Sequence, residues 1–233
     1  MVTVISLGGS IVAPDGVDTG FLKSFAALVG ALLEGDAELK LVLVVGGGGP
    51  ARAWQNAYRE VADEASVGEA SVNDEADWIG VMATRLNAQL VRAVLARWCP
   101  QEVVTDPTAV RSIDGRILVA AGWKPGFSSD YDAVLLAERF GAGTVVNLSN
   151  IDRVYTADPR TDPGARPVDR ISWAEFRAMV GEEWVPGKNV PFDPVASRHA
   201  HEAGIGVVCA DGRNLENLGR IVRGGEFVGT LIR

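Results

Sequence analysis

A run of apolar residues that leads directly into four glycines and a proline limits the fold more than any other feature. Residues 41–45 read LVLVV, residues 46–49 are all glycine, and Pro50 follows. A continuous apolar run of this kind is typical of a strand buried on both faces. Proline is favoured at the first position of a helix. The segment therefore predicts a buried strand, a glycine turn and a helix that begins at Pro50.

The same alternation of strand and helix patterns continues along the chain. Strands are predicted for residues 2–7, 41–45, 102–105, 117–121, 144–148, 206–210 and 227–232, and helices for 19–33, 74–98, 132–140, 171–180, 193–203 and 215–222. Alternating strands and helices favour the α/β class, here a three-layer α/β/α sandwich around a mostly parallel sheet. No internal repeat or long linker divides the chain, so we expect a single domain over residues 1–233.

The composition argues against several classes of protein. The chain has 22 Lys and Arg against 30 Asp and Glu, a net charge of −8, which disfavours nucleic-acid binding. Residues 60–77 hold seven acidic residues and no basic one, and we expect a solvated surface there. No signal peptide or membrane-spanning run is recognised. Cys99 and Cys209 lack metal-ligand spacing, so we predict a reducing, cytoplasmic location and no metal-ligating residues.

Two glycine turns follow apolar strands and predict phosphate binding. Glycine lets phosphate oxygens approach main-chain N–H groups, and a following helix adds its positive dipole end. The alternative is a pair of tight connections with no ligand. The fingerprint G-x-G-x-x-A fits residues 46–51, but the acidic strand end that it requires about 20 residues further on is missing, as is the Walker pattern. The predicted phosphate-binding residues are Gly8, Gly9, Ser10, Gly46, Gly47 and Gly48.

A set of short motifs runs along the whole chain in a fixed order. They are ISLGGS at 5–10, VVGGGGPAR at 44–52, DWIG at 77–80, MATRLN at 82–87, PGFSSD at 125–130, SNIDRVYTADP at 149–159, FDP at 192–194 and the segment 225–232. In order and spacing they resemble the amino acid kinase superfamily, and within it the archaeal-type uridylate kinases. The stretch at 154–159 is the most specific part of this resemblance.

The resemblance implies an enzyme that transfers the γ-phosphoryl group of ATP to UMP with Mg²⁺, usually as a hexamer. It implies an acceptor-binding N-terminal lobe over residues 1–140 and an ATP-binding C-terminal lobe over 141–233. Arg52 and Asp130 would be catalytic. The acceptor would be held by Asp77, Gly80, Thr84, Gly122, Trp123, Lys124, Gly126, Ser128 and Ser129. ATP would be held by Ser149, Asn150, Tyr155 and Asp158.

Several of these residues have simpler structural interpretations. Ser128 is an ordinary helix N-cap residue, Tyr155 a possible core aromatic, and Asp158 a residue that favours turns. Lys124 could be a solvated loop lysine instead of a phosphate ligand. The apolar helix predicted at 19–33 could form oligomer contacts or be buried within the sandwich.

The chain departs from the family pattern close to the expected site. Ser6 stands where many kinases of the superfamily have lysine, Trp123-Lys124 replaces Thr-His, and Arg153 replaces glycine. Asp132 adds a second carboxylate two residues after Asp130. Lys188 could replace the missing lysine, although a surface position is the simpler interpretation.

These departures leave other functions open. One is a kinase with a different small acceptor, such as a phosphate, carbamate or carboxylate. Another is an ATP-binding protein that stores molybdenum or tungsten oxoanions, which the C-terminal segment at 225–233 also resembles. A third is a nucleotide sensor without catalysis.

Overall fold

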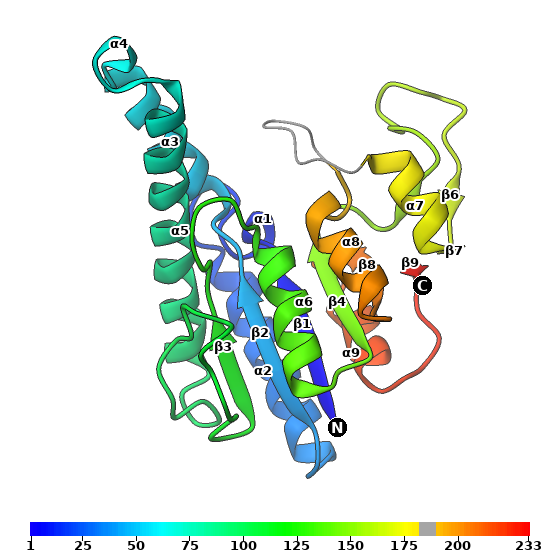
Figure 1. Ribbon diagram of the computed structural model, residues 1–233. Coiled ribbons are helices and arrows are strands. Elements are labelled where there is room, and N and C mark those ends of the chain that lie inside the picture. Colours follow the sequence, from blue (N-terminus) through cyan, green and yellow to red (C-terminus); the bar gives the residue numbers. More distant parts are fainter. Residues whose placement is uncertain (182–189) are drawn as a thin grey trace.

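The computed structural model describes residues 1–181 and 190–233, and its strands form one long sheet and one short one (Figure 1). The long sheet has the order β3-β2-β1-β4-β8-β9-β7. Its strands are β1 (Val2–Leu7), β2 (Lys40–Val45), β3 (Ile117–Ala120), β4 (Thr144–Ser149), β7 (Arg170–Ile171), β8 (Gly206–Asp211) and β9 (Thr230–Ile232). All neighbouring pairs are parallel except β8 and β9. The short sheet pairs β5 (Val154–Tyr155) with β6 (Pro167–Val168).

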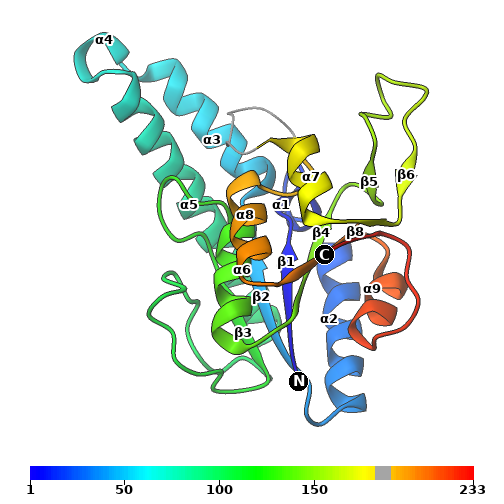
Figure 2. The same ribbon diagram turned by 45° about the vertical axis from the view of Figure 1, so that its right-hand side comes forward.

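Helices cover both faces of the long sheet (Figures 1 and 2). One face packs against α2 (Thr19–Gly35), α5 (Glu69–Val94) and α9 (Leu215–Val222), and the other against α6 (Ser129–Phe140), α7 (Trp173–Val180) and α8 (Pro194–Glu202). Successive side chains of β1 pack against opposite helix layers, because Val4 belongs to one core cluster and Ile5 to the other. The predicted α/β/α sandwich with a mostly parallel sheet is therefore confirmed.

The apolar helix predicted at 19–33 is buried within the chain. Phe25 and Val29 are 1% exposed in α2, and Asp18 caps the helix by accepting a hydrogen bond from the Phe21 N–H. Burying an aromatic or aliphatic side chain of this size stabilises a fold by about 1.5–3 kcal/mol. Packing inside the sandwich therefore accounts for the apolar pattern of α2.

Two of the predicted strands differ from the structure. Residues 102–105 form no strand, and only Val104 pairs with the sheet edge, at Ala120. Pro107 follows closely and cannot donate to a sheet. The strand predicted at 227–232 is shortened to β9, because the side-chain amide of Asn217 pairs with both the N–H and the C=O of Val228. A side chain has taken the place of a neighbouring strand there.

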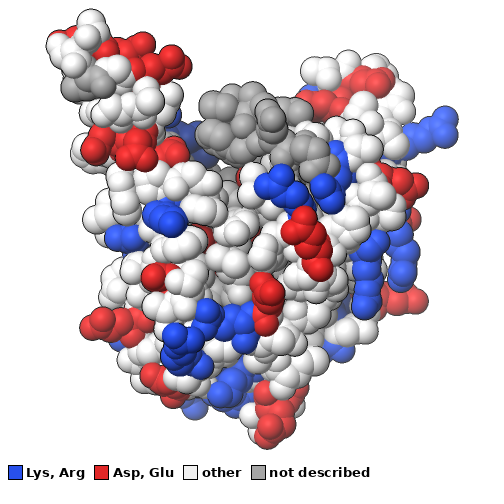
Figure 3. Space-filling model, viewed as in Figure 1, with Lys and Arg blue, Asp and Glu red and all other residues white. Residues whose placement is uncertain are grey.

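Three helices form an arm that projects from the sandwich (Figures 1 and 3). They are α3 (Gly48–Val61), α4 (Glu64–Val67) and α5, and the Gln55 side chain donates to the Ala76 carbonyl to hold α3 against α5. Acidic side chains gather on the arm, where Glu60, Asp63, Glu64, Glu69, Asp74 and Glu75 are exposed. The acidic stretch is therefore solvated, as expected from the sequence.

Not every apolar residue of the helix predicted at 74–98 is buried. Small residues such as Ala76, Gly80 and Ala83 form the buried face of α5. Met82 is 58% exposed and Leu86 is 71% exposed. An apolar strip of α5 is therefore open to solvent in a single chain. Within the described ranges, no helix is long and apolar enough to cross a membrane.

Candidate functional site

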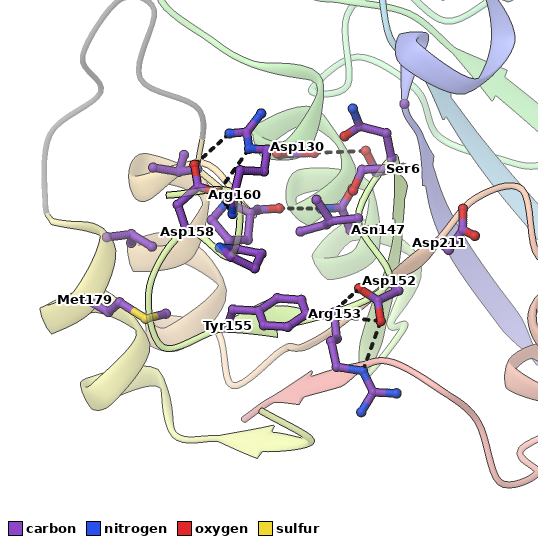
Figure 4. Close-up of a pocket in the computed structure, with 18 of the residues that line it drawn as sticks. Ser6, Asp130, Asn147, Asp152, Arg153, Tyr155, Asp158, Arg160, Met179 and Asp211 are labelled. Carbon is purple, nitrogen blue, oxygen red and sulfur yellow. Dashed lines mark hydrogen bonds and ion pairs between the residues drawn. The ribbon is translucent and has the colours of Figure 1, made fainter. Parts of the chain in front are cut away.

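The carboxyl ends of the central parallel strands open into a pocket, where α/β sheets commonly bind ligands. The pocket has a volume of about 1090 Å³. Gly8 follows β1, Ser149 ends β4 and Asp211 ends β8, so three adjacent strands deliver residues to it. The opposite wall includes Met179 of α7 (Figure 4).

All four residues predicted to hold ATP line this pocket: Ser149, Asn150, Tyr155 and Asp158. The Tyr155 hydroxyl donates to the Asp152 carboxylate at 3.1 Å, so Tyr155 is not a core aromatic. Arg160 donates two side-chain hydrogen bonds and its backbone N–H to Asp158, which lowers the pKa of that carboxyl to about 2. Asp158 is therefore an anion at neutral pH, beside a cation that also lines the pocket.

Asp130 lines the pocket and lies in the first turn of α6 (Figure 4). It accepts hydrogen bonds from the Ser6 hydroxyl at 3.0 Å and from the Asp193 N–H at 3.3 Å. Burial and the nearby Asp193 carboxylate outweigh these bonds and raise the pKa of Asp130 to about 6. Ser6, at the position of the missing lysine, thus makes a direct contact with the predicted catalytic carboxylate.

The two glycine turns lie against each other, backbone to backbone. A Cβ placed on Gly9 would lie 2.0 Å from the Gly48 nitrogen, and one on Gly46 would lie 2.6 Å from the Gly9 nitrogen. Gly48 also has a φ of +65°, which favours glycine. Ser10 continues from this contact into the short helix α1 (Gly9–Val12). Main-chain groups of both turns are therefore brought together at the ends of β1 and β2.

Arg52 lies on α3 beyond the glycine turn and does not line the pocket. Its guanidinium is exposed and donates to the Pro14 carbonyl at 3.3 Å. The structure therefore does not bring the two residues predicted to be catalytic into one cavity, since Asp130 lines it and Arg52 does not.

The residues predicted to hold the acceptor gather around the loop that leads from β3 into α6. Thr84 accepts a hydrogen bond from the Gly122 N–H at 2.7 Å, and Asp77 accepts one from the Gly126 N–H at 3.4 Å. Gly47 lies close to both Gly80 and Thr84. This loop, which we call the acceptor loop (residues 122–128), is thus tied to α5 and lies next to the glycine turns.

The aromatic and charged residues of the acceptor loop contact one another. The Trp123 and Phe127 rings lie 5.0 Å apart, and the Lys124 ammonium lies 4.0 Å from the centre of the Trp123 ring. Ser128 caps α6 by accepting from the Tyr131 N–H, as its structural interpretation predicts, and it also hydrogen-bonds Asp193. Ser129 lines the pocket beside Asp130.

Sequence reasoning missed several residues of the pocket. Asn147 donates to the Pro191 carbonyl, and Arg213 pairs with Asp18 at 3.0 Å. Two signals in the sequence could have identified them. Asn147 is a polar residue inside an apolar strand, and Asp211 and Arg213 belong to a polar run that follows the apolar strand at 206–210. Lys188, the candidate replacement for the missing lysine, lies outside the residues that the structure describes.

The chain is similar to known proteins over nearly its whole length. The model of the amino acid kinase family matches residues 1–211. A uridylate kinase from Methanospirillum hungatei is 37% identical over 233 residues, covering 98% of this chain and 93% of the relative. One from Hyperthermus butylicus is 35% identical, covering 98% and 96%.

Solved structures give the same result. The crystal structure of uridylate kinase from Archaeoglobus fulgidus has a TM-score of 0.82 at 31% identity and covers 100% of both chains. The UMP kinase of Bacillus anthracis has a TM-score of 0.72 at 20% identity, covering 100% of this chain and 95% of that one, and shares the fold.

Proposed function

The chain belongs to the amino acid kinase family, and on that premise we propose that it transfers the γ-phosphoryl group of ATP to UMP. The observation that carries the proposal is the match to relatives named uridylate kinase over 98% of this chain at up to 37% identity. The pocket supports it, because all four residues predicted to hold ATP line one cavity together with Asp130.

We assign the two substrates to the two halves of the sheet. ATP would bind in the pocket formed by residues 141–233, with its phosphates directed toward the glycine turns. UMP would bind beside the acceptor loop, in the half formed by residues 1–140, where Asp77 of α5 could accept hydrogen bonds from the ribose hydroxyls. The γ-phosphate and the acceptor phosphate would then meet near Gly9 and Gly48.

Phosphoryl transfer requires positioning and charge stabilisation more than covalent chemistry. The main-chain N–H groups of the glycine turns would cradle the phosphates, and Arg52 would turn from Pro14 toward them. Asp130, held by Ser6 and by the Asp193 N–H, would fix the relative position of the two turns and the pocket.

We infer that a magnesium ion would arrive with the nucleotide. Among the described residues, no group of three or more His, Cys, Asp or Glu side chains could hold a metal ion. Mg²⁺ commonly takes most of its ligands from substrate phosphates and water. The ion would neutralise phosphate charge, while the residues named above bind and orient the substrates.

We further propose that the protein is a homo-oligomer, a hexamer by family resemblance, in the cytoplasm. The exposed apolar strip of α5 supports a contact between copies of the chain, because Met82 and Leu86 are more than half exposed in one copy. The cysteines support a reducing compartment, since both are buried and free.

The test is an assay of ADP release from ATP and Mg²⁺ with UMP, CMP, AMP, dTMP or no acceptor. We expect release that depends on UMP and is much slower with the other acceptors. Release without acceptor preference, or no release, would contradict the proposal. The alternative functions give distinct results: another small acceptor would restore turnover, and an oxoanion-storage protein would contain molybdenum or tungsten by elemental analysis.

A further inference from the structure

We propose that Asp132 is a positioning residue that holds the acceptor loop in its binding conformation through the Trp123 peptide. This inference rests on the proposed function, since it concerns the site assigned to UMP. Asp132 is fully buried in the first turn of α6, and its Oδ2 accepts a hydrogen bond from the Trp123 N–H at 3.1 Å.

The backbone of Trp123 is held from both layers of the sandwich, at its N–H and at its C=O. Asp132 of α6 binds its N–H from one face of the sheet. Arg85 of α5, on the other face, donates from Nη2 to the Trp123 carbonyl at 3.0 Å. A loop residue fixed on both its donor and its acceptor has little freedom to shift along either helix.

The unsatisfied polar atoms of the molecule point to the same peptide. Over the part of the chain that the structure describes, only Arg85 Nε and Asp132 Oδ1 are buried side-chain polar atoms without a hydrogen-bond partner. Burying such atoms costs free energy. The side chain of Asp132 makes one hydrogen bond, and that bond is to the Trp123 N–H, so contact with the acceptor loop is the role that the structure shows for this buried carboxyl.

The first turn of α6 thereby connects both halves of the site. Asp130 and Asp132 lie two residues apart, and they point to different places. Asp130 lines the pocket assigned to ATP, whereas Asp132 contacts the acceptor loop. A displacement of the loop should therefore weaken the acceptor site without displacing residues of the ATP site such as Tyr155.

The test compares Asp132→Ala, which removes the acceptor oxygen, with Asp132→Asn, which keeps one for the Trp123 N–H. Glu138→Gln is the matched control, because Glu138 is an exposed carboxylate on the same helix. We expect Asp132→Ala to raise KM for UMP by about tenfold, the equivalent of one lost buried hydrogen bond, with KM for ATP nearly unchanged. Asp132→Asn and Glu138→Gln should both retain a KM for UMP near that of the unmodified protein.

Two kinetic outcomes would overturn the proposal. One is an unchanged KM for UMP in Asp132→Ala. The other is an equal rise of both KM values, which a general structural role would produce.

A second measurement keeps this inference separate from the proposed function and from failure of a variant to fold. In the unmodified protein, the Trp123 amide should be protected from hydrogen exchange. Asp132→Asn should keep that protection, and Asp132→Ala should lose it. Rapid exchange of the Trp123 amide in the unmodified protein would refute the positioning role, whatever the activity. Absence of UMP-dependent turnover with normal protection would refute only the proposed function.

Discussion

Asp130 is ionisable, half-buried and adjacent to another carboxylate, and it opens into the pocket. Replacing it with asparagine should lower kcat by 10² or more, on the order of the loss of one preorganised group. The thermal midpoint at pH 8 should not fall, because the raised pKa shows that the fold disfavours the ionised form. Turnover assays and thermal melts measure the two effects, and near-normal turnover would contradict a catalytic role.

Arg52, the second residue predicted to be catalytic, differs from Asp130 because it does not line the pocket. Its side chain is exposed and makes one long hydrogen bond, to Pro14. Arg52→Ala should therefore leave the thermal midpoint unchanged while lowering kcat by orders of magnitude, because the cation would be missing from the transferring phosphates. Arg59→Ala, further along the same helix, is the control and should retain turnover. Equal turnover in the two variants would show that Arg52 does not contact the phosphates.

Asp132 should make the stability of the protein depend on pH. Burial, with smaller contributions from Asp130 and Asp106, raises its pKa from 3.8 to about 7. Its stabilising contribution is therefore complete below pH 3.8 and is lost as the pH rises through 7. The free energy of unfolding of Asp132→Asn, relative to that of the unmodified protein, should therefore increase from pH 4 to pH 8, by at most about 4 kcal/mol. Denaturant unfolding at both pH values measures this gain, and a constant difference would contradict it.

At the scale of single elements, α5 has one small-residue face against α3 and one apolar strip toward solvent. If the proposed contact between copies uses this strip, Leu86→Glu should lower the mass of the assembly measured by sedimentation or light scattering, because a charge would be desolvated in that contact. Val17→Glu is the matched control, since Val17 is also an exposed aliphatic residue but lies outside the arm. An unchanged mass for Leu86→Glu would place the contact elsewhere.

The segment before β9 depends on a single side chain. Asn217 of α9 makes two hydrogen bonds to the Val228 backbone, at 2.7 and 2.8 Å. Asn217→Ala would leave two backbone groups without partners, at a cost of about 1–3 kcal/mol. Urea unfolding should detect this loss. The neighbouring Glu216→Gln, which removes only an exposed ion pair, should change stability by less than about 1 kcal/mol.

At the scale of the whole molecule, local patterns predicted most of the fold. The apolar run at 41–45 and the periodicity at 215–222 marked β2 and α9 within a residue, because burial on two faces and helical spacing are local properties. The strand predicted at 102–105 was wrong because only Val104 pairs with the sheet edge, and a pair of valines does not indicate how many neighbouring residues will pair. The residues assigned to ATP came from the family resemblance, and their roles stay predictions.

Contacts between distant residues could not be predicted in this way. The Ser6 hydroxyl meets Asp130 across 124 positions of sequence, and nothing near Ser6 indicates that partner. The same holds for Asp132 and Trp123, because their contact depends on the path of the loop between them. In the sequence, Asp132 and Ser6 stand out only as departures from the family pattern.

The glycine turns have a consequence for how this chain can vary. Every amino acid other than glycine carries a Cβ, so every missense change in a glycine codon adds one. At position 9 that atom would meet the Gly48 nitrogen at 2.0 Å, and at position 48 it would meet the Gly9 oxygen at 2.3 Å. No substitution at either position avoids this added Cβ. Substituting both positions together would add two such atoms at the same backbone contact. Any amino acid that replaces glycine at position 9 or 48 is therefore expected to displace the backbone where the two turns meet.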